Sequence, residues 1–194
     1  MAVKAVVFDV GETLVDETEM WSELADMAGV PRFALFGVVG GLAARGEHWA
    51  HAFDLLGVER PTGSPFSPTS LYPDAAGCVA RLRADGYLVG LAGNASDSGY
   101  SLLELDVDFV GNSGSWGVEK PSPAFFDRVV AACGCRAEQI AYVGDRVDND
   151  VEPALAAGMT AVHIRRGPWG HLHEPPPEAL RIRTLDELPE ALGV

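Results

Sequence analysis

The chain has 194 residues, of which 47% are apolar and 22% charged, enough apolar material for one packed domain of about 150 residues with an insertion. Its 28 acidic and 14 basic residues give a net charge of −14, which repels nucleic-acid phosphates and anionic lipid. These figures exclude disorder, collagen and coiled coil, and they disfavour nucleic-acid binding.

The cysteines and the N-terminus indicate a reduced compartment. Cys78, Cys133 and Cys135 are odd in number and lack zinc-site spacing, so no disulfide framework or structural metal site is expected. The N-terminal apolar run reaches Asp9 too early for a signal peptide, and no stretch approaches the ~20 apolar residues of a membrane span. We expect a soluble cytoplasmic protein that binds neither nucleic acid nor membrane, and the sequence predicts no oligomeric state.

Short apolar runs, each ended by glycine or polar turn residues, predict buried strands. They cover residues 5–8, 87–92, 109–110, 140–143 and 161–164. Helical patterns lie between them at residues 75–84, 98–105, 123–132 and 151–157, and Gly158 is placed to end the last one. This alternation predicts an α/β fold, a Rossmann-like parallel sheet with helices on both faces.

Residues 16–72 break the alternation, because they hold no strand pattern. Three amphipathic segments at residues 17–28, 32–45 and 47–56 are followed by a proline-rich return to the sheet at residues 61–73. We predict a small α-helical cap at residues 16–72, inserted into a core domain of residues 1–15 and 73–194.

Acidic residues follow two of the predicted strands, at the sheet edge where parallel sheets bind ligands. Asp9 comes directly after the first strand. Asp145 ends another, and Asp148 and Asp150 follow in the same short segment. Such carboxylates repel unless a cation intervenes, and oxygen ligands suit Mg²⁺. Helix capping is the simpler alternative, but it needs only one of these acids.

Two further features lie at loop positions. Lys120 precedes Pro121 and Pro123, which favour a helix start just after it, so its ammonium lies at a loop-to-helix junction. Gly93-Asn94 ends a strand, and backbone N–H groups at such a turn can hold a phosphate oxygen. Taken singly, a solvated lysine and an ordinary strand-to-helix turn explain both.

Together, these features resemble the haloacid dehalogenase-like (HAD) hydrolase superfamily in order and spacing. The resemblance rests on Asp9 with Thr13 and Leu14, the Gly93-Asn94 turn, Lys120 before a proline, and "GDRVDND" followed by a helix and "AAGM". The inserted helices resemble the mobile cap that many members carry between the first and second motifs.

The resemblance implies a Mg²⁺-dependent phosphatase that acts on a small phosphorylated metabolite. Asp9 would attack phosphorus and form an aspartyl-phosphate, which water then hydrolyses. The implied metal ligands are Asp9, the backbone carbonyl of Gly11, Asp145 and, through water, Asp150. The implied phosphate-binding residues are Gly93, Asn94 and Lys120, whose ammonium offsets the charge of the phosphate.

Two positions depart from the family pattern. Phosphatases of this superfamily usually carry a second aspartate at the position of Gly11, and a serine or threonine at that of Gly93. Glu12 is the nearest substitute for the missing acid/base. Loss of a general acid costs about 10² to 10⁴ in rate, so we expect a slow enzyme or one selective for good leaving groups.

Two other functions remain open at this point. A 2-haloacid dehalogenase also lacks an acid at the position of Gly11, but it attacks carbon without a metal, and the retention of Asp145 with Asp150 argues for phosphorus chemistry. A catalytically degenerate member would bind a phosphorylated ligand or a partner without turnover.

Overall fold

The computed structural model describes residues 2–62, 70–96, 100 and 103–193, and within them the chain forms one six-stranded sheet. The strand order is β3-β2-β1-β4-β5-β6, and every neighbouring pair is parallel. The strands are β1 (Ala5–Phe8), β2 (Leu88–Gly93), β3 (Phe109–Asn112), β4 (Ile140–Gly144), β5 (Thr160–Ile164) and β6 (Leu180–Ile182). The predicted α/β fold is confirmed.

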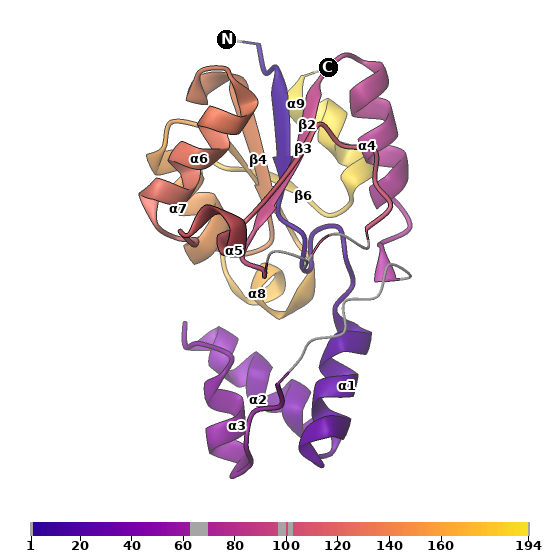
Figure 1. Ribbon diagram of the computed structural model, residues 1–194, viewed down its shortest axis with the longest axis vertical. Coiled ribbons are helices and arrows are strands. Elements are labelled where there is room, and N and C mark those ends of the chain that lie inside the picture. Colours follow the sequence, from indigo (N-terminus) through magenta and orange to yellow (C-terminus); the bar gives the residue numbers. More distant parts are fainter. Residues whose placement is uncertain (1, 63–69, 97–99, 101–102, 194) are drawn as a thin grey trace.

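Helices cover both faces of the sheet (Figure 1). One face carries α4 (Ala75–Ala84) and α9 (Leu188–Leu192), and the other carries α5 (Ser113–Trp116), α6 (Pro123–Cys133) and α7 (Glu152–Ala156). A short helix, α8 (Gly167–Leu172), lies beyond the carboxyl end of β5.

Strand β1 shows why the apolar runs are continuous. Val6 and Phe8 pack into the core under α4 and α9, whereas Ala5 and Val7 pack into the core under α6 and α7. All four side chains are at most 1% exposed. Because successive side chains of a strand point to opposite faces, a strand buried on both faces must be apolar at every position.

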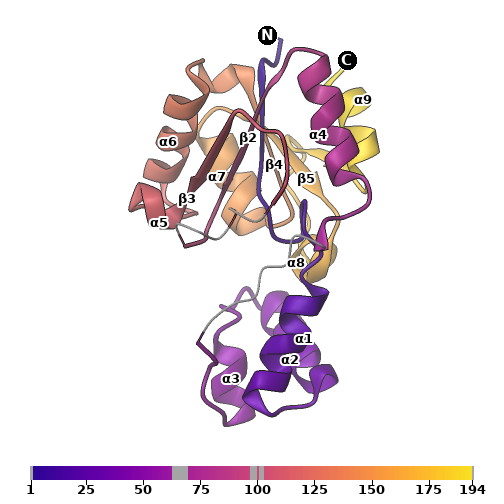
Figure 2. The same cartoon turned by 45° about the vertical axis from the view of Figure 1, so that its right-hand side comes forward.

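Residues 18–56 form three helices that lie beyond the carboxyl ends of the strands (Figure 2). They are α1 (Thr18–Ala28), α2 (Arg32–Ala44) and α3 (His51–Leu56). These helices share an apolar core to which α8 contributes Trp169. Its buried members are Trp21, Leu24, Ala25, Leu35, Val39, Leu42, Ala43, Ala52, Phe53 and Trp169.

Among the described residues, no one helix has the length and apolarity needed to cross a membrane; α1 and α2 meet the criteria only as a pair, bent by 115°.

Several elements differ from the prediction. Strand β6 was not predicted, because its three residues carry Arg181 in the middle and give no apolar run. The helix predicted at 151–157 begins at Glu152, because a π-helical turn over Val147–Val151 precedes it. Of the helix predicted at 98–105, residues 98, 99, 101 and 102 lie outside the described residues, and residues 103–105 are not helical.

A buried ion pair connects the turn after β1 to the rest of the core. Arg166, which follows β5, pairs with Asp74 at the start of α4 and donates from Nη1 to the Thr13 carbonyl at 2.7 Å. Asp74 also accepts a hydrogen bond from the Leu185 N–H at 2.9 Å. Both charged side chains are about nine-tenths buried, so each depends on the other for compensation.

We expect Asp74→Ala to lower the free energy of unfolding by about 3 kcal/mol, because it leaves the Arg166 guanidinium buried without its counterion. Urea denaturation followed by circular dichroism measures this change. The control is Asp186→Ala, which breaks the exposed pair with Arg81 and should cost less than about 1 kcal/mol. Equal losses in the two variants would contradict the assignment.

Candidate functional site

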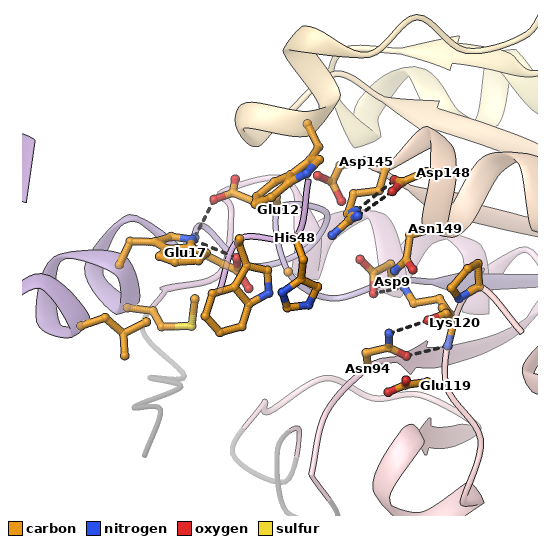
Figure 3. Close-up of a pocket in the computed structure, with 18 of the residues that line it drawn as sticks. Asp9, Glu12, Glu17, His48, Asn94, Glu119, Lys120, Asp145, Asp148 and Asn149 are labelled. Atoms are coloured by element: carbon orange, nitrogen blue, oxygen red, sulfur yellow. Dashed lines mark hydrogen bonds and ion pairs between the residues drawn. The ribbon is translucent and has the colours of Figure 1, made fainter. Parts of the chain in front are cut away.

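The carboxyl ends of three neighbouring strands bring the predicted site residues together. Asp9 follows β1, Asn94 follows β2 and Asp145 follows β4, and these strands are adjacent in the sheet. All three residues line a cavity of about 900 Å³ that is also lined by residues of α1. Figure 3 shows Asp9, Lys120 and Asn94 on one side of this cavity and Glu12 and Glu17 on the other.

Lys120 lies at the centre of the site and is 4% exposed. Its Nζ donates to Asp9 Oδ1 at 2.7 Å and to Asp150 Oδ1 at 2.6 Å. Burial opposes the charge, but the carboxylates of Asp150 and Asp9 outweigh it and hold the pKa of Lys120 well above its usual value. The ammonium is therefore a permanent positive charge beside Asp9.

Asn94 positions Lys120 through the backbone. Its Nδ2 donates to the Lys120 carbonyl at 3.0 Å, and its Oδ1 accepts from the Lys120 N–H at 2.8 Å. The side-chain amide of Asn94 thus holds the loop that carries the lysine. Its neighbour Gly93 lies directly beside Asp9.

Asp9, Asp145 and Asp150 form a buried carboxylate cluster in which one oxygen from each lies within 4.8 Å of the others. Burial raises the pKa of Asp145 well above its usual value, and Asp150 and Asp9 raise it further. Burial also raises the pKa of Asp150 to about 6, against the lowering effect of Lys120. A divalent cation would offset this excess of negative charge, and the all-oxygen donor set suits Mg²⁺.

The π-helical turn explains why Asp150 and Asp148 differ. Asp150 is fully buried, and its Oδ2 accepts from the Arg146 N–H at 3.0 Å, which directs the carboxylate into the cluster. Asp148 points elsewhere and pairs with the Arg146 guanidinium at 2.7 Å, with its side chain 47% exposed. Asp148 therefore lies outside the carboxylate cluster.

Glu12 is held in a strained turn. Its backbone has φ of 51°, a left-handed conformation that is uncommon for residues other than glycine. Its Oε2 accepts from the Tyr72 hydroxyl at 2.6 Å, and its Oε1 from the Glu17 N–H at 3.2 Å. Burial raises the pKa of Glu12. The side chain lines the cavity, but both of its oxygens are already engaged by these donors.

Glu17 is a site residue that the sequence analysis missed. A Cβ at Gly11 would overlap Glu17 Oε1 and lie 2.9 Å from Cδ, so the Glu17 carboxyl fills the space beside Gly11. Its Oε2 accepts from Trp21 Nε1 at 3.2 Å. Burial raises the pKa of Glu17 to about 8, and the nearby Glu12 and Asp9 raise it further. The sequence shows only that Glu17 lies at the start of a predicted helix.

Tyr100 is a second site residue that was missed. A Cβ at Gly93 would overlap the Tyr100 hydroxyl and lie 2.6 Å from Asp9 Oδ1. Tyr100 is 4% exposed and lines the cavity. Burial raises the pKa of its phenol, and the charge on Asp9 raises it further. The hydroxyl therefore remains protonated and lies next to Asp9.

Aromatic side chains line the outer part of the cavity. Trp21 and Trp49 meet edge to face with ring centroids 5.4 Å apart, and His48 stacks on Trp49 at 5.3 Å. The guanidinium of Arg60 lies 5.7 Å from the centroid of the same Trp49 ring. This part of the cavity combines flat apolar surface with positive charge.

Comparisons with known proteins agree with this geometry. Residues 3–158 match the family described as haloacid dehalogenase-like hydrolase. A glyceraldehyde 3-phosphate phosphatase of Methanopyrus kandleri is 33% identical over 125 residues. The match covers 61% of this chain and 50% of that protein, so the chain spans about half the length of this relative. A protein of the same name from Pyrococcus furiosus is 25% identical over 99% of this chain and 92% of its own length.

Among solved structures, L-2-haloacid dehalogenase from Xanthobacter autotrophicus is similar in fold. Its TM-score is 0.69 at 18% identity, and the match covers 98% of each chain. At this level of identity, the likeness concerns the fold alone.

We expect Mg²⁺ to raise the thermal unfolding midpoint, because the ion would offset the charge of the carboxylate cluster in the folded state. At 100 times its dissociation constant, a bound ion stabilises by about 2.7 kcal/mol. Asp145→Asn should remove most of this shift while leaving the metal-free protein no less stable, since the repulsion within the cluster falls. Differential scanning fluorimetry with and without Mg²⁺ makes the measurement.

Asp148→Asn is the matched control, because Asp148 lies on the same segment but outside the cluster. It should retain the Mg²⁺-dependent shift. A shift of the same size in Asp145→Asn would show that the ion binds elsewhere.

Proposed function

We propose that this chain, which belongs to the haloacid dehalogenase-like hydrolases, is a phosphatase that acts on a small phosphorylated metabolite. The observation that carries the proposal is the buried set of Asp9, Lys120 and Asp145 at one sheet edge, facing a cavity large enough for such a substrate. The relatives named as phosphatases support the same reaction class.

In this proposal Asp9 is the nucleophile. Its carboxylate forms a bond to phosphorus while the ester oxygen departs, and water then releases orthophosphate from the aspartyl-phosphate. A carboxylate approaches a phosphate dianion only where positive charge offsets the repulsion. The Lys120 ammonium, held at 2.7 Å from Asp9 Oδ1, supplies part of that charge, and Gly93 and Asn94 are proposed to help bind the phosphoryl group.

The chemistry of the donor set suits Mg²⁺ as the cofactor. Asp9, Asp145 and the carbonyl of Gly11 would hold the ion, and Asp150 would support it. When bound, Mg²⁺ supplies positive charge that stabilises the transferring phosphoryl group. The raised pKa of Asp145 supports this assignment, because carboxylates crowded in a dry site favour a cation.

We further propose that residues 16–72 act as a cap that selects the substrate. Their separate apolar core and their share in the cavity lining support this role. The aromatic rings and Arg60 suit a leaving group with a flat or apolar part and a further polar or anionic group. Glyceraldehyde 3-phosphate, named for two of the relatives, belongs in the first substrate panel.

The leaving group also limits the proposed reaction. Gly11 carries no carboxyl, and Glu12, the substitute proposed from the sequence, has both oxygens engaged by Tyr72 and the Glu17 N–H. Because neither Gly11 nor Glu12 supplies a proton to the leaving oxygen, esters that need no proton donor, such as aryl phosphates and acyl phosphates, should be the best substrates.

We expect the wild-type protein to release phosphate from p-nitrophenyl phosphate in the presence of Mg²⁺, and Asp9→Asn to reduce the release to the level of the buffer blank. The Asn variant keeps the shape of the side chain but lacks the nucleophilic charge. Absorbance of p-nitrophenolate and an orthophosphate assay report the rate, and EDTA tests the need for the metal.

Two further assays on the same protein distinguish a phosphatase from a dehalogenase and from a binding protein without turnover. Chloride release from 2-chloropropionate without added metal would favour a dehalogenase. If neither substrate reacts, while orthophosphate still raises the unfolding midpoint, the chain is a binding protein without turnover. Either result would overturn the proposed phosphatase.

A further inference from the structure

Two glycines beside Asp9 leave space that side chains from elsewhere in the chain occupy. The Glu17 carboxyl lies where a side chain at Gly11 would start, and the Tyr100 hydroxyl lies where one at Gly93 would start. We infer that Glu17 exchanges the proton of the leaving-group oxygen and that Tyr100 donates a hydrogen bond to the transferring phosphoryl group. This inference rests on the proposed phosphatase function and names two further catalytic residues for it.

The position of Glu17 carries the first half of the inference. Its carboxyl carbon is 2.9 Å from the point where a Cβ of residue 11 would stand, two residues along the chain from Asp9. Trp21 Nε1 holds Oε2 at 3.2 Å, and the backbone N–H of Glu17 is held by Glu12. These two hydrogen bonds fix the side chain at both ends and direct Oε1 toward Gly11.

Glu17 suits this role better than Glu12. Glu12 accepts hydrogen bonds from the Tyr72 hydroxyl and the Glu17 N–H, one on each oxygen. Those bonds direct Glu12 toward the turn and give it a structural part in holding Glu17. The turn that gives Glu12 its left-handed backbone therefore places its carboxyl where it accepts the hydrogen bond from the Glu17 N–H.

The proposed reaction has two steps, and Glu17 gives up a proton in the first and regains one in the second. In the first, the Asp9 carboxylate bonds to phosphorus, the bond from phosphorus to the ester oxygen breaks, and the Glu17 carboxyl gives its proton to that oxygen. In the second, water bonds to phosphorus, its proton passes to the Glu17 carboxylate, and the bond from phosphorus to Asp9 breaks. The products are an alcohol, orthophosphate and the starting form of the enzyme.

The position of Tyr100 carries the second half. Its hydroxyl and Asp9 Oδ1 both lie against the same point above Gly93, so a phosphoryl group bonded to Asp9 comes within reach of the hydroxyl. Lys120 already divides its hydrogen bonds between Asp9 and Asp150. A neutral donor adds stabilisation of the phosphoryl oxygens without a further charge to bury.

Leaving-group dependence tests Glu17. We expect Glu17→Gln to lower kcat/KM for glycerol phosphate, whose alkoxide is a poor leaving group, by about 100-fold or more. It should lower kcat/KM for p-nitrophenyl phosphate by less than about 10-fold, because kcat/KM reports only the first step and nitrophenolate departs without a proton. Glu23→Gln, at an exposed position of α1 outside the cavity lining, is the matched control and should leave both values unchanged.

A double variant moves the carboxyl from residue 17 to residue 11. In Gly11→Asp combined with Glu17→Ala, the new side chain has the space that the Glu17 carboxyl leaves, and this variant should recover glycerol phosphate hydrolysis relative to Glu17→Ala alone. An equal loss of kcat/KM for both substrates in Glu17→Gln, or no recovery in the double variant, overturns the role. If the wild-type protein hydrolyses neither ester, it is the phosphatase proposal that fails.

Phosphate binding tests Tyr100 without turnover. We expect Tyr100→Phe to weaken orthophosphate binding by about 10-fold in isothermal titration calorimetry, because one hydrogen bond to a charged group is lost. Tyr87→Phe, outside the cavity lining, is the control and should bind as the wild type does. Unchanged affinity in a Tyr100→Phe protein with a normal unfolding midpoint overturns the assignment.

Discussion

The site depends on one ammonium shared by two buried carboxylates. Lys120 joins Asp9, which follows β1, to Asp150, on the turn that follows β4, and its backbone is bonded to Asn94 at the end of β2. Because none of these charges is stable alone in a dry interior, each stabilises the loops that carry the other two. The pairing that assembles the loops also sets positive charge beside the proposed nucleophile.

The carboxylate cluster remains short of positive charge even with Lys120 in place. Asp9, Asp145 and Asp150 share the edge with Glu12 and Glu17, and burial together with the nearby carboxylates raises the pKa of Asp145 and of Asp150. An arrangement with this much unfavourable repulsion is typical of functional sites, where a cation or an anionic substrate completes the balance. The Asp74 and Arg166 pair stabilises the adjoining turn independently of any ligand.

The sheet and the positions of Asp9, Lys120 and Asp145 could be predicted because strand ends and prolines mark them locally. Parallel order then places strand ends at one edge, which brings distant residues together without any knowledge of side-chain packing. Glu17 and Tyr100 could not be predicted in this way. Each enters the site through the space above a glycine, Gly11 or Gly93, and a glycine in a sequence does not say which side chain will fill the space it leaves.

The position of Glu17 would couple the two proposed roles, substrate selection by the inserted helices and proton transfer. Glu17 directly precedes α1, the first helix of the proposed cap, and its carboxyl is held by Trp21 of that helix. Trp21 in turn belongs to the apolar core that α1, α2 and α3 share with Trp169 of α8. A movement of these helices relative to the sheet would therefore carry the carboxyl with it. In the proposed mechanism Glu17 reaches the leaving oxygen only when these helices lie over the substrate, so the proposed cap and the proposed acid would act together.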